Sequence, residues 1–179
     1  PDLYVSALGA LKAQCVFTPM FSAFGPDPIA QRLHLGRIRI LVTTPMLYRR
    51  KVAGIVDRLP DLELVLICGA TEDQTAGSAT GVGGPRVLSM GSFLCDATDT
   101  FEIGYTDPET PALLHFTSGT TGTPKGAVHV HGAVIAHQRE FTGQTVRTAA
   151  GHQPPRRRQR QLRSVHDARQ DRMVAQIGD

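Results

Sequence analysis

The chain has 179 residues, enough for one domain with a single hydrophobic core. Its hydrophobic fraction of 41% is typical of a globular protein, and no run of about 18 apolar residues predicts a membrane span. The net charge of +3 is uneven: seven of 19 basic and three of 16 acidic residues lie in 151–179, leaving 12 against 13 in residues 1–150. The main part of the chain therefore has no electrostatic reason to bind nucleic acid.

Three widely spaced cysteines, Cys15, Cys68 and Cys95, lie among apolar neighbours. An odd number without the spacing of a disulfide framework favours reduced thiols, so we expect a cytoplasmic protein. The first residues show no charged-then-apolar leader, and the sequence opens at Pro1 inside a helical pattern. We therefore expect its N-terminus to be a cut edge within a longer protein.

The first third of the chain alternates helical and strand patterns. Apolar residues at helical spacing predict a helix over residues 2–13, and CVFTPMF predicts a buried strand that ends at Pro19. PDPIAQRLHLG predicts a helix, because it starts with proline and ends at Gly36, the residue types that commonly begin and end helices. The β-branched run IRILVTT then predicts a second strand.

The middle of the chain continues this alternation. PMLYRRKVAGIVDRLP predicts a helix between two prolines, and LELVLICG predicts a strand that ends at Gly69. ATEDQTAGSATGVGGPR predicts a surface loop, VLSMGSFLCDA a short helix, and ALLHFT and GAVHVH two further strands. Strands alternating with helices indicate an α/β fold with a largely parallel sheet.

Residues 151–179 differ from the rest in composition. They are rich in arginine and glutamine, contain no lysine or aromatic residue, and have few large apolar side chains. Such a segment cannot bury enough surface to offset its ordering entropy, so we predict a disordered or weakly helical tail. An alternative hypothesis is a frameshift in GC-rich coding DNA. We accordingly divide the chain into a domain over 1–150 and a tail over 151–179.

The stretch TSGTTGTPKG, from Thr117 to Gly126, has the composition of a phosphate-binding loop. Its glycines let backbone N–H groups approach an anion closely, its hydroxyls add donors, and Lys125 adds a positive charge. It is not a Walker A loop, because Pro124 stands where the second glycine is required and Gly126 where Ser or Thr is required. A strand, and not a helix, is also predicted to follow.

The loop resembles the phosphate-binding motif of adenylate-forming enzymes, T-S-G-[ST]-T-G-x-P-K-G, at every position. LLHFTSGTTGTPKGAVHVHGAV is similar to the acetyl-CoA synthetase (acetate–CoA ligase) branch, and the likeness extends over about residues 1 to 145. It implies part of an N-terminal adenylation domain with an incomplete sheet. One departure is Gln14, where the family usually has glycine at a tight helix-to-strand turn.

The resemblance also implies ligands and roles. The relatives activate a carboxylic acid with ATP and Mg²⁺, forming an acyl-adenylate, and then transfer the acyl group to coenzyme A. We expect small-molecule substrates and no membrane partner, and we assign no catalytic or metal-binding residue. The expected phosphate contacts are Thr117, Ser118, Gly119, Thr120, Thr121, Gly122, Thr123, Pro124, Lys125 and Gly126.

Weaker candidates lie outside this loop. The FSAF segment, Phe21 to Phe24, resembles a segment that approaches coenzyme A, with Arg49 or Arg50 near its phosphates, although a core-edge aromatic pair and solvated arginines are the favoured interpretation. His129 and His131 would share one face of a strand, but no third metal ligand has suitable spacing.

Two alternatives to a ligase remain open. The chain could be a non-catalytic nucleotide-binding module, or it could act on nucleic acid through its basic tail, which lacks interleaved aromatic residues. The family's adenine, ribose and acid-pocket segments come after the glycine-rich loop in its members, and the chain has no tryptophan. We therefore expect incomplete activity from these 179 residues alone.

Overall fold

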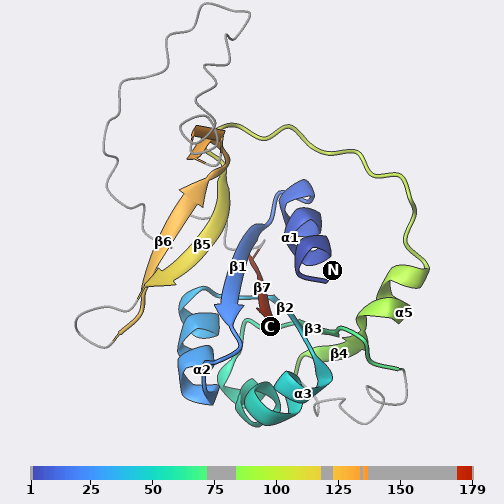
Figure 1. Ribbon diagram of the computed structural model, residues 1–179, viewed down its shortest axis with the longest axis vertical. Coiled ribbons are helices and arrows are strands. Elements are labelled where there is room, and N and C mark those ends of the chain that lie inside the picture. Colours follow the sequence, from blue (N-terminus) through green and yellow to red (C-terminus); the bar gives the residue numbers. More distant parts are fainter. Residues whose placement is uncertain (1, 72–83, 118–122, 134, 137–172, 179) are drawn as a thin grey trace, which may run out of the picture.

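The computed structural model describes residues 2–71, 84–117, 123–133, 135–136 and 173–178. These residues form a mixed α/β structure around a seven-stranded sheet (Figure 1). Among the described helices, none is long and apolar enough to cross a membrane. In chain order the elements are α1 (Asp2–Lys12), β1 (Val16–Phe21), α2 (Pro26–Leu35), β2 (Ile40–Thr43), α3 (Pro45–Leu47), η1 (Tyr48–Val52), η2 (Ala53–Arg58), β3 (Leu64–Ile67), β4 (Arg86–Ser89), α5 (Met90–Cys95), β5 (Pro111–Thr117), β6 (Lys125–Val130) and β7 (Met173–Gly178).

The strand order is β4-β3-β2-β7-β1-β5-β6. All neighbouring pairs are parallel except β5 with β6, which form an antiparallel hairpin. The predicted largely parallel α/β fold is therefore confirmed. Figure 1 shows this hairpin projecting from one end of the sheet, while the parallel strands lie between the helices.

The last strand, β7, contradicts the expected tail. Its residues pair with β1 from Val16↔Met173 to Phe21↔Gly178 and with β2 from Ile40↔Val174 to Val42↔Gln176. All of its residues except the last are buried. The prediction that 151–179 lacks buried structure is thus wrong for 173–178, because a central parallel strand is apolar on both faces and needs only a few residues. The arginine-rich part, 151–172, lies outside the described residues.

The sheet separates two layers of helices. On one face, α2, η1 and η2 bury a large cluster that includes Leu33, Val52 and Ile55, together with Leu41 and Ile177 of the sheet. On the opposite face α1 contributes Ala10, which packs against Phe17 and Val174, and Met90 of α5 packs against Val42 and Leu66. Strands covered on both faces account for the apolar runs in the sequence.

Several boundaries differ from the sequence predictions. The strand β1 continues through Pro19 to Phe21. The helix predicted after Thr44 changes pitch, from a short α-turn (α3) to a π-turn (η1) and a 3₁₀ segment (η2). The short helix expected in VLSMGSFLCDA is preceded by a strand, β4, which extends the sheet beyond β3.

The backbone at Gln14 explains why a glycine suits this position. Gln14 has φ of 59°, in the left-handed region that costs a residue with a Cβ roughly 1–2 kcal/mol. The side chain of Gln14 also makes a long-range hydrogen bond, because its Nε2 donates to the backbone oxygen of Tyr105 at 2.6 Å. The turn between α1 and β1 is therefore as tight as expected, and the side chain that strains it also fixes a distant segment.

Candidate functional site

The glycine-rich loop connects β5 to β6. Thr117 is the last residue of β5 and pairs with Lys125, the first residue of β6. The hydroxyl of Thr117 donates to the backbone oxygen of Lys125 at 3.4 Å, so the two ends of the loop are held together. Five expected contacts, Ser118, Gly119, Thr120, Thr121 and Gly122, lie outside the described residues.

The described end of the loop has the features of an anion site. Lys125 and Thr123 are exposed, whereas Pro124 between them is buried. Lys125 takes part in none of the three ion pairs that the described residues form, which are Arg37–Asp61, Arg39–Glu63 and Arg58–Asp27. Its ammonium group therefore has no carboxylate partner in the described part of the chain, and it can donate to a bound anion.

The loop follows the carboxyl end of β5, where the sheet also opens a pocket. β1 pairs with β7 along its whole length, but it pairs with β5 only between Phe17 and Leu113. β1 leads through α2 to β2 on one side, and β5 leads through the hairpin to β6 on the other. Ligand sites of open α/β sheets lie outside the carboxyl ends of the strands.

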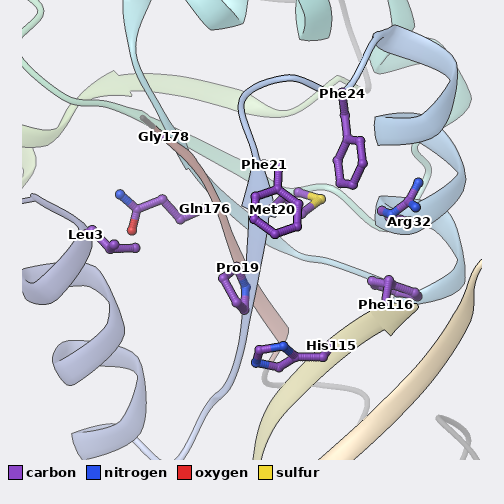
Figure 2. A pocket seen from close by; sticks show the side chains of 10 residues that line it. All are labelled: Leu3, Pro19, Met20, Phe21, Phe24, Arg32, His115, Phe116, Gln176 and Gly178. Carbon is purple, nitrogen blue, oxygen red and sulfur yellow. The ribbon is translucent and has the colours of Figure 1, made fainter. Parts of the chain in front are cut away.

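The pocket has a volume of about 310 Å³ and is lined mainly by apolar side chains. Figure 2 shows Met20 and Phe21 of β1 at its centre and His115 and Phe116 of β5 along one side. His115 and Phe116 immediately precede Thr117, so the pocket and the glycine-rich loop are adjacent in the chain.

A lysine supports the rim of this pocket. Lys51, on η1, donates to the backbone oxygens of Ser22 and Phe24, the latter at 2.9 Å. These two contacts fix the loop that follows β1, and Phe24 on that loop lines the pocket. Lys51 lies within the π-helical turn of η1, and such turns are frequent at functional sites.

The FSAF segment and its arginines are partly explained. Phe21 and Phe24 pack edge to face, with ring centroids 5.6 Å apart. Phe24 is partly buried against the core, whereas Phe21 is 74% exposed, so only Phe24 fits the favoured interpretation of a core-edge pair. Arg49 and Arg50 are exposed on η1. A role for either arginine in binding coenzyme A stays a prediction.

The histidine pair differs from the expected one. His131 lies beyond the end of β6, so it does not share a strand face with His129. His129 instead packs against His115 of the neighbouring strand, with ring centroids 5.3 Å apart. No group of three His, Cys, Asp or Glu side chains suited to a metal occurs within the described ranges. Sequence reasoning missed His115 because the pairing depends on the hairpin register.

The pKa of His115 is lowered from its ordinary value of 6.5, first by burial and second by the charge of His129. As the pH falls, His115 is therefore protonated in the unfolded chain at a higher pH than in the folded chain. His115 does not reduce the free energy of unfolding above about pH 6.5, and it reduces that free energy as the pH falls below this value. We expect replacement of His129 by phenylalanine to raise the pKa of His115, as measured by NMR titration of the ring protons. An unchanged titration would contradict a charge interaction between the two rings.

Comparison with known proteins agrees with these observations. The chain matches the AMP-binding enzyme family over residues 1–167. It belongs to this family. The prediction made from the glycine-rich loop is therefore confirmed at the level of the family.

Curated relatives include acetyl-coenzyme A synthetases. That of Bacillus subtilis (strain 168) is 34% identical over 146 residues, which cover 82% of this chain and 23% of the relative. The acetyl-coenzyme A synthetase of Bdellovibrio bacteriovorus is 28% identical over 148 residues, which cover 76% of this chain and 22% of the relative. The chain thus spans less than a quarter of the length of these relatives.

Solved structures share the fold. An acyl-CoA synthetase from Brucella canis superposes with a TM-score of 0.58 at 22% identity, covering 78% of this chain and 23% of that structure. The adenylation domain of a carboxylate reductase from Mycobacterium chelonae has a TM-score of 0.54 at 15% identity. The match covers 97% of this chain and 33% of that structure. At these identities the likeness establishes the adenylation-domain fold.

Proposed function

We propose that this chain provides the ATP-phosphate site of an acid-activating ligase. The observation that supports this proposal is the loop between β5 and β6. Its ends, Thr117 and Lys125, are paired across the hairpin and hydrogen-bonded at the carboxyl end of β5. At such a site, an exposed ammonium group with no carboxylate partner among the described residues favours a polyphosphate. All ten residues from Thr117 to Gly126 are proposed phosphate contacts.

The proposed reaction is the AMP-forming ligation of a short acid, such as acetate, to coenzyme A. The carboxylate oxygen attacks the α-phosphorus of ATP, an acyl-adenylate forms, and pyrophosphate leaves. The thiol of coenzyme A then attacks the acyl carbonyl, and AMP leaves. The glycine-rich loop contributes by orienting the β- and γ-phosphates and stabilising their charge.

Mg²⁺ is proposed as the ion that accompanies ATP. No cluster of three potential metal ligands occurs among the described residues, so we assign none of them to this ion. Phosphate oxygens are ligands that Mg²⁺ prefers, and the ion would reduce the negative charge that Lys125 faces. No step of the reaction is assigned to a metal-binding side chain.

Equilibrium binding to the purified 179-residue chain tests the proposal. We expect ATP to bind more tightly than ADP, and ADP more tightly than adenosine, because the loop contacts the terminal phosphates. Equal affinities for ATP and adenosine would contradict phosphate binding. In the presence of acetate and Mg²⁺ we expect no pyrophosphate release, since the chain spans 23% of the Bacillus subtilis relative. Far-UV circular dichroism on the same sample controls for folding.

A further inference from the structure

Residues 93–109, from α5 almost to β5, form an exposed surface that is called the acidic–aromatic strip below. All of these residues except Thr106 are exposed. Figure 1 shows residues 96–110 as an extended segment that runs around the periphery of the molecule from α5 to β5. The large apolar side chains of the strip are Phe93, Leu94, Phe101, Ile103 and Tyr105. Exposed apolar side chains that gather among polar ones mark an interaction surface.

The strip is also strongly negative. Its five acidic residues are Asp96, Asp99, Glu102, Asp107 and Glu109, and it contains no lysine, arginine or histidine. The first four of these take part in none of the three ion pairs that the described residues form. Arginine fits such a surface best, because its guanidinium group binds carboxylates through several N–H donors and also stacks on aromatic rings.

The strip is held in place at two points but is not covered between them. Nε2 of Gln14 donates to the backbone oxygen of Tyr105 at 2.6 Å, and the backbone N–H of Gly132 donates to that of Pro108 at 2.8 Å. The backbone of residues 98–106 forms no hydrogen bond with the backbone of any other described residue. A segment that is positioned but uncovered is preorganised to receive a partner.

The complementary charge lies in the same chain. Residues 151–172 contain seven arginines and two aspartates, a net charge of +5, against five acidic residues in the strip. This segment has no aromatic residue of its own. Its guanidinium groups can therefore stack only on rings elsewhere, and the strip offers exposed rings next to carboxylates.

Chain connectivity brings the arginine-rich segment close to the strip. The described ranges end at residue 136, four residues after Gly132, which is bonded to Pro108 of the strip. They resume at Met173, where β7 begins to pair with β1, and β1 starts two residues after Gln14, the other residue bonded to the strip. Both ends of residues 137–172 are thus attached beside the strip. This covalent connection raises the effective concentration of one segment at the other, so that individually weak surface ion pairs suffice.

We propose that the acidic–aromatic strip is the docking surface for the arginine-rich segment 151–172 of the same chain. Guanidinium groups pair with Asp99 and Glu102 and lie against the rings of Phe101 and Tyr105. None of these residues belongs to the glycine-rich loop, so this docking is separate from the proposed phosphate site.

Tryptophan fluorescence of the 179-residue chain provides the test. The chain has no tryptophan and Tyr105 is 86% exposed, so Tyr105→Trp places a single reporter on the strip. The comparison is the same chain with all seven arginines of 151–172 replaced by glutamine. We expect acrylamide, a neutral quencher, to quench the reporter about twofold less in the chain that keeps its arginines, because guanidinium groups cover the indole ring. Equal quenching of the two chains would overturn the proposal.

Charge variants that also carry Tyr105→Trp test the carboxylates. Asp99→Asn combined with Glu102→Gln should raise quenching to the level of the arginine-free chain. Asp57→Asn is the control, because it neutralises an exposed carboxylate on η2, in the opposite layer of helices, and should leave quenching unchanged. If the strip variant stays as protected as the control, charge pairing does not hold the segment and the proposal is wrong.

Salt provides a measurement that needs no change in the arginines. In about 1 M NaCl, where the Debye length is about 3 Å, the reporter should become as accessible as in the arginine-free chain. Far-UV circular dichroism checks that every variant is folded. If the arginine-free chain does not fold, the salt series decides, and protection that is unchanged by salt would contradict docking through charge.

Dependence on protein concentration identifies the occupant of the strip. Docking within one chain gives the same protection over a roughly hundredfold range of concentration, with a monomer mass in analytical ultracentrifugation. Protection that increases with concentration, together with a dimer mass, would assign the strip to a second copy of the chain. That result would overturn docking within the chain.

Discussion

Replacement of Ala175 by aspartate is expected to unfold the chain. Ala175 is fully buried at the middle of β7, between β1 and β2, and it packs within the largest core cluster. A carboxylate there would lose its hydration without a partner, and the added atoms would displace a close-packed core. We expect a loss of about 3–5 kcal/mol in the free energy of unfolding, a large part of the stability of a domain of this size.

Urea denaturation followed by circular dichroism measures this loss. Ala53→Asp is the matched control, because Ala53 is exposed on η2 and the same substitution there should change the unfolding free energy by less than about 0.5 kcal/mol. Similar denaturation midpoints for Ala175→Asp and the unmodified chain would mean that 173–178 does not occupy the centre of the sheet. The experiment therefore tests the largest difference between the sequence predictions and the structure.

Replacement of Lys125 by alanine is expected to weaken ATP binding by about 10- to 100-fold. A hydrogen bond to a charged group contributes roughly 1.5–3 kcal/mol, and 1.4 kcal/mol corresponds to a factor of ten in affinity. Lys125 is exposed at the start of β6 and has no carboxylate partner among the described residues, so its removal should affect ligand binding and not folding.

Two further variants make this result specific. Lys12→Ala removes an exposed lysine at the end of α1 and should leave ATP affinity unchanged. Lys125→Arg keeps the charge with a different geometry, and an intermediate affinity is expected. If Lys125→Ala binds ATP as tightly as the unmodified chain, Lys125 is not a phosphate contact and the proposed role of the hairpin end is wrong.

Local patterns predicted much of the fold because each is read within a short window. The helical spacing in 2–13, the proline and Gly36 that bracket α2, and the β-branched run of β2 all correspond to elements of the structure. The hairpin around TSGTTGTPKG was predictable for the same reason, since two apolar strands directly flank a glycine-rich turn. These features also sufficed to predict the family.

The site was less accessible to sequence reasoning. The loop residues from Thr117 to Gly126 stand out by composition alone, whereas Arg32 reads as an ordinary polar position of an amphipathic helix. Its burial, its contact with Phe24 and the adjacent pocket arise only when α2 packs on the sheet beside β1. The pairing of His115 with His129 likewise depends on strand register.

The sequence by itself determined the glycine-rich turn between two strands, the family and the alternation of helices and strands, because these depend on neighbouring residues. Only the tertiary structure decided the position of β7. MVAQIG is a short run next to an arginine-rich stretch, and its composition gives no sign of a central strand. It becomes one because β1 and β2 present unpaired backbone groups on either side, and burial between them satisfies those groups and covers apolar surface at once.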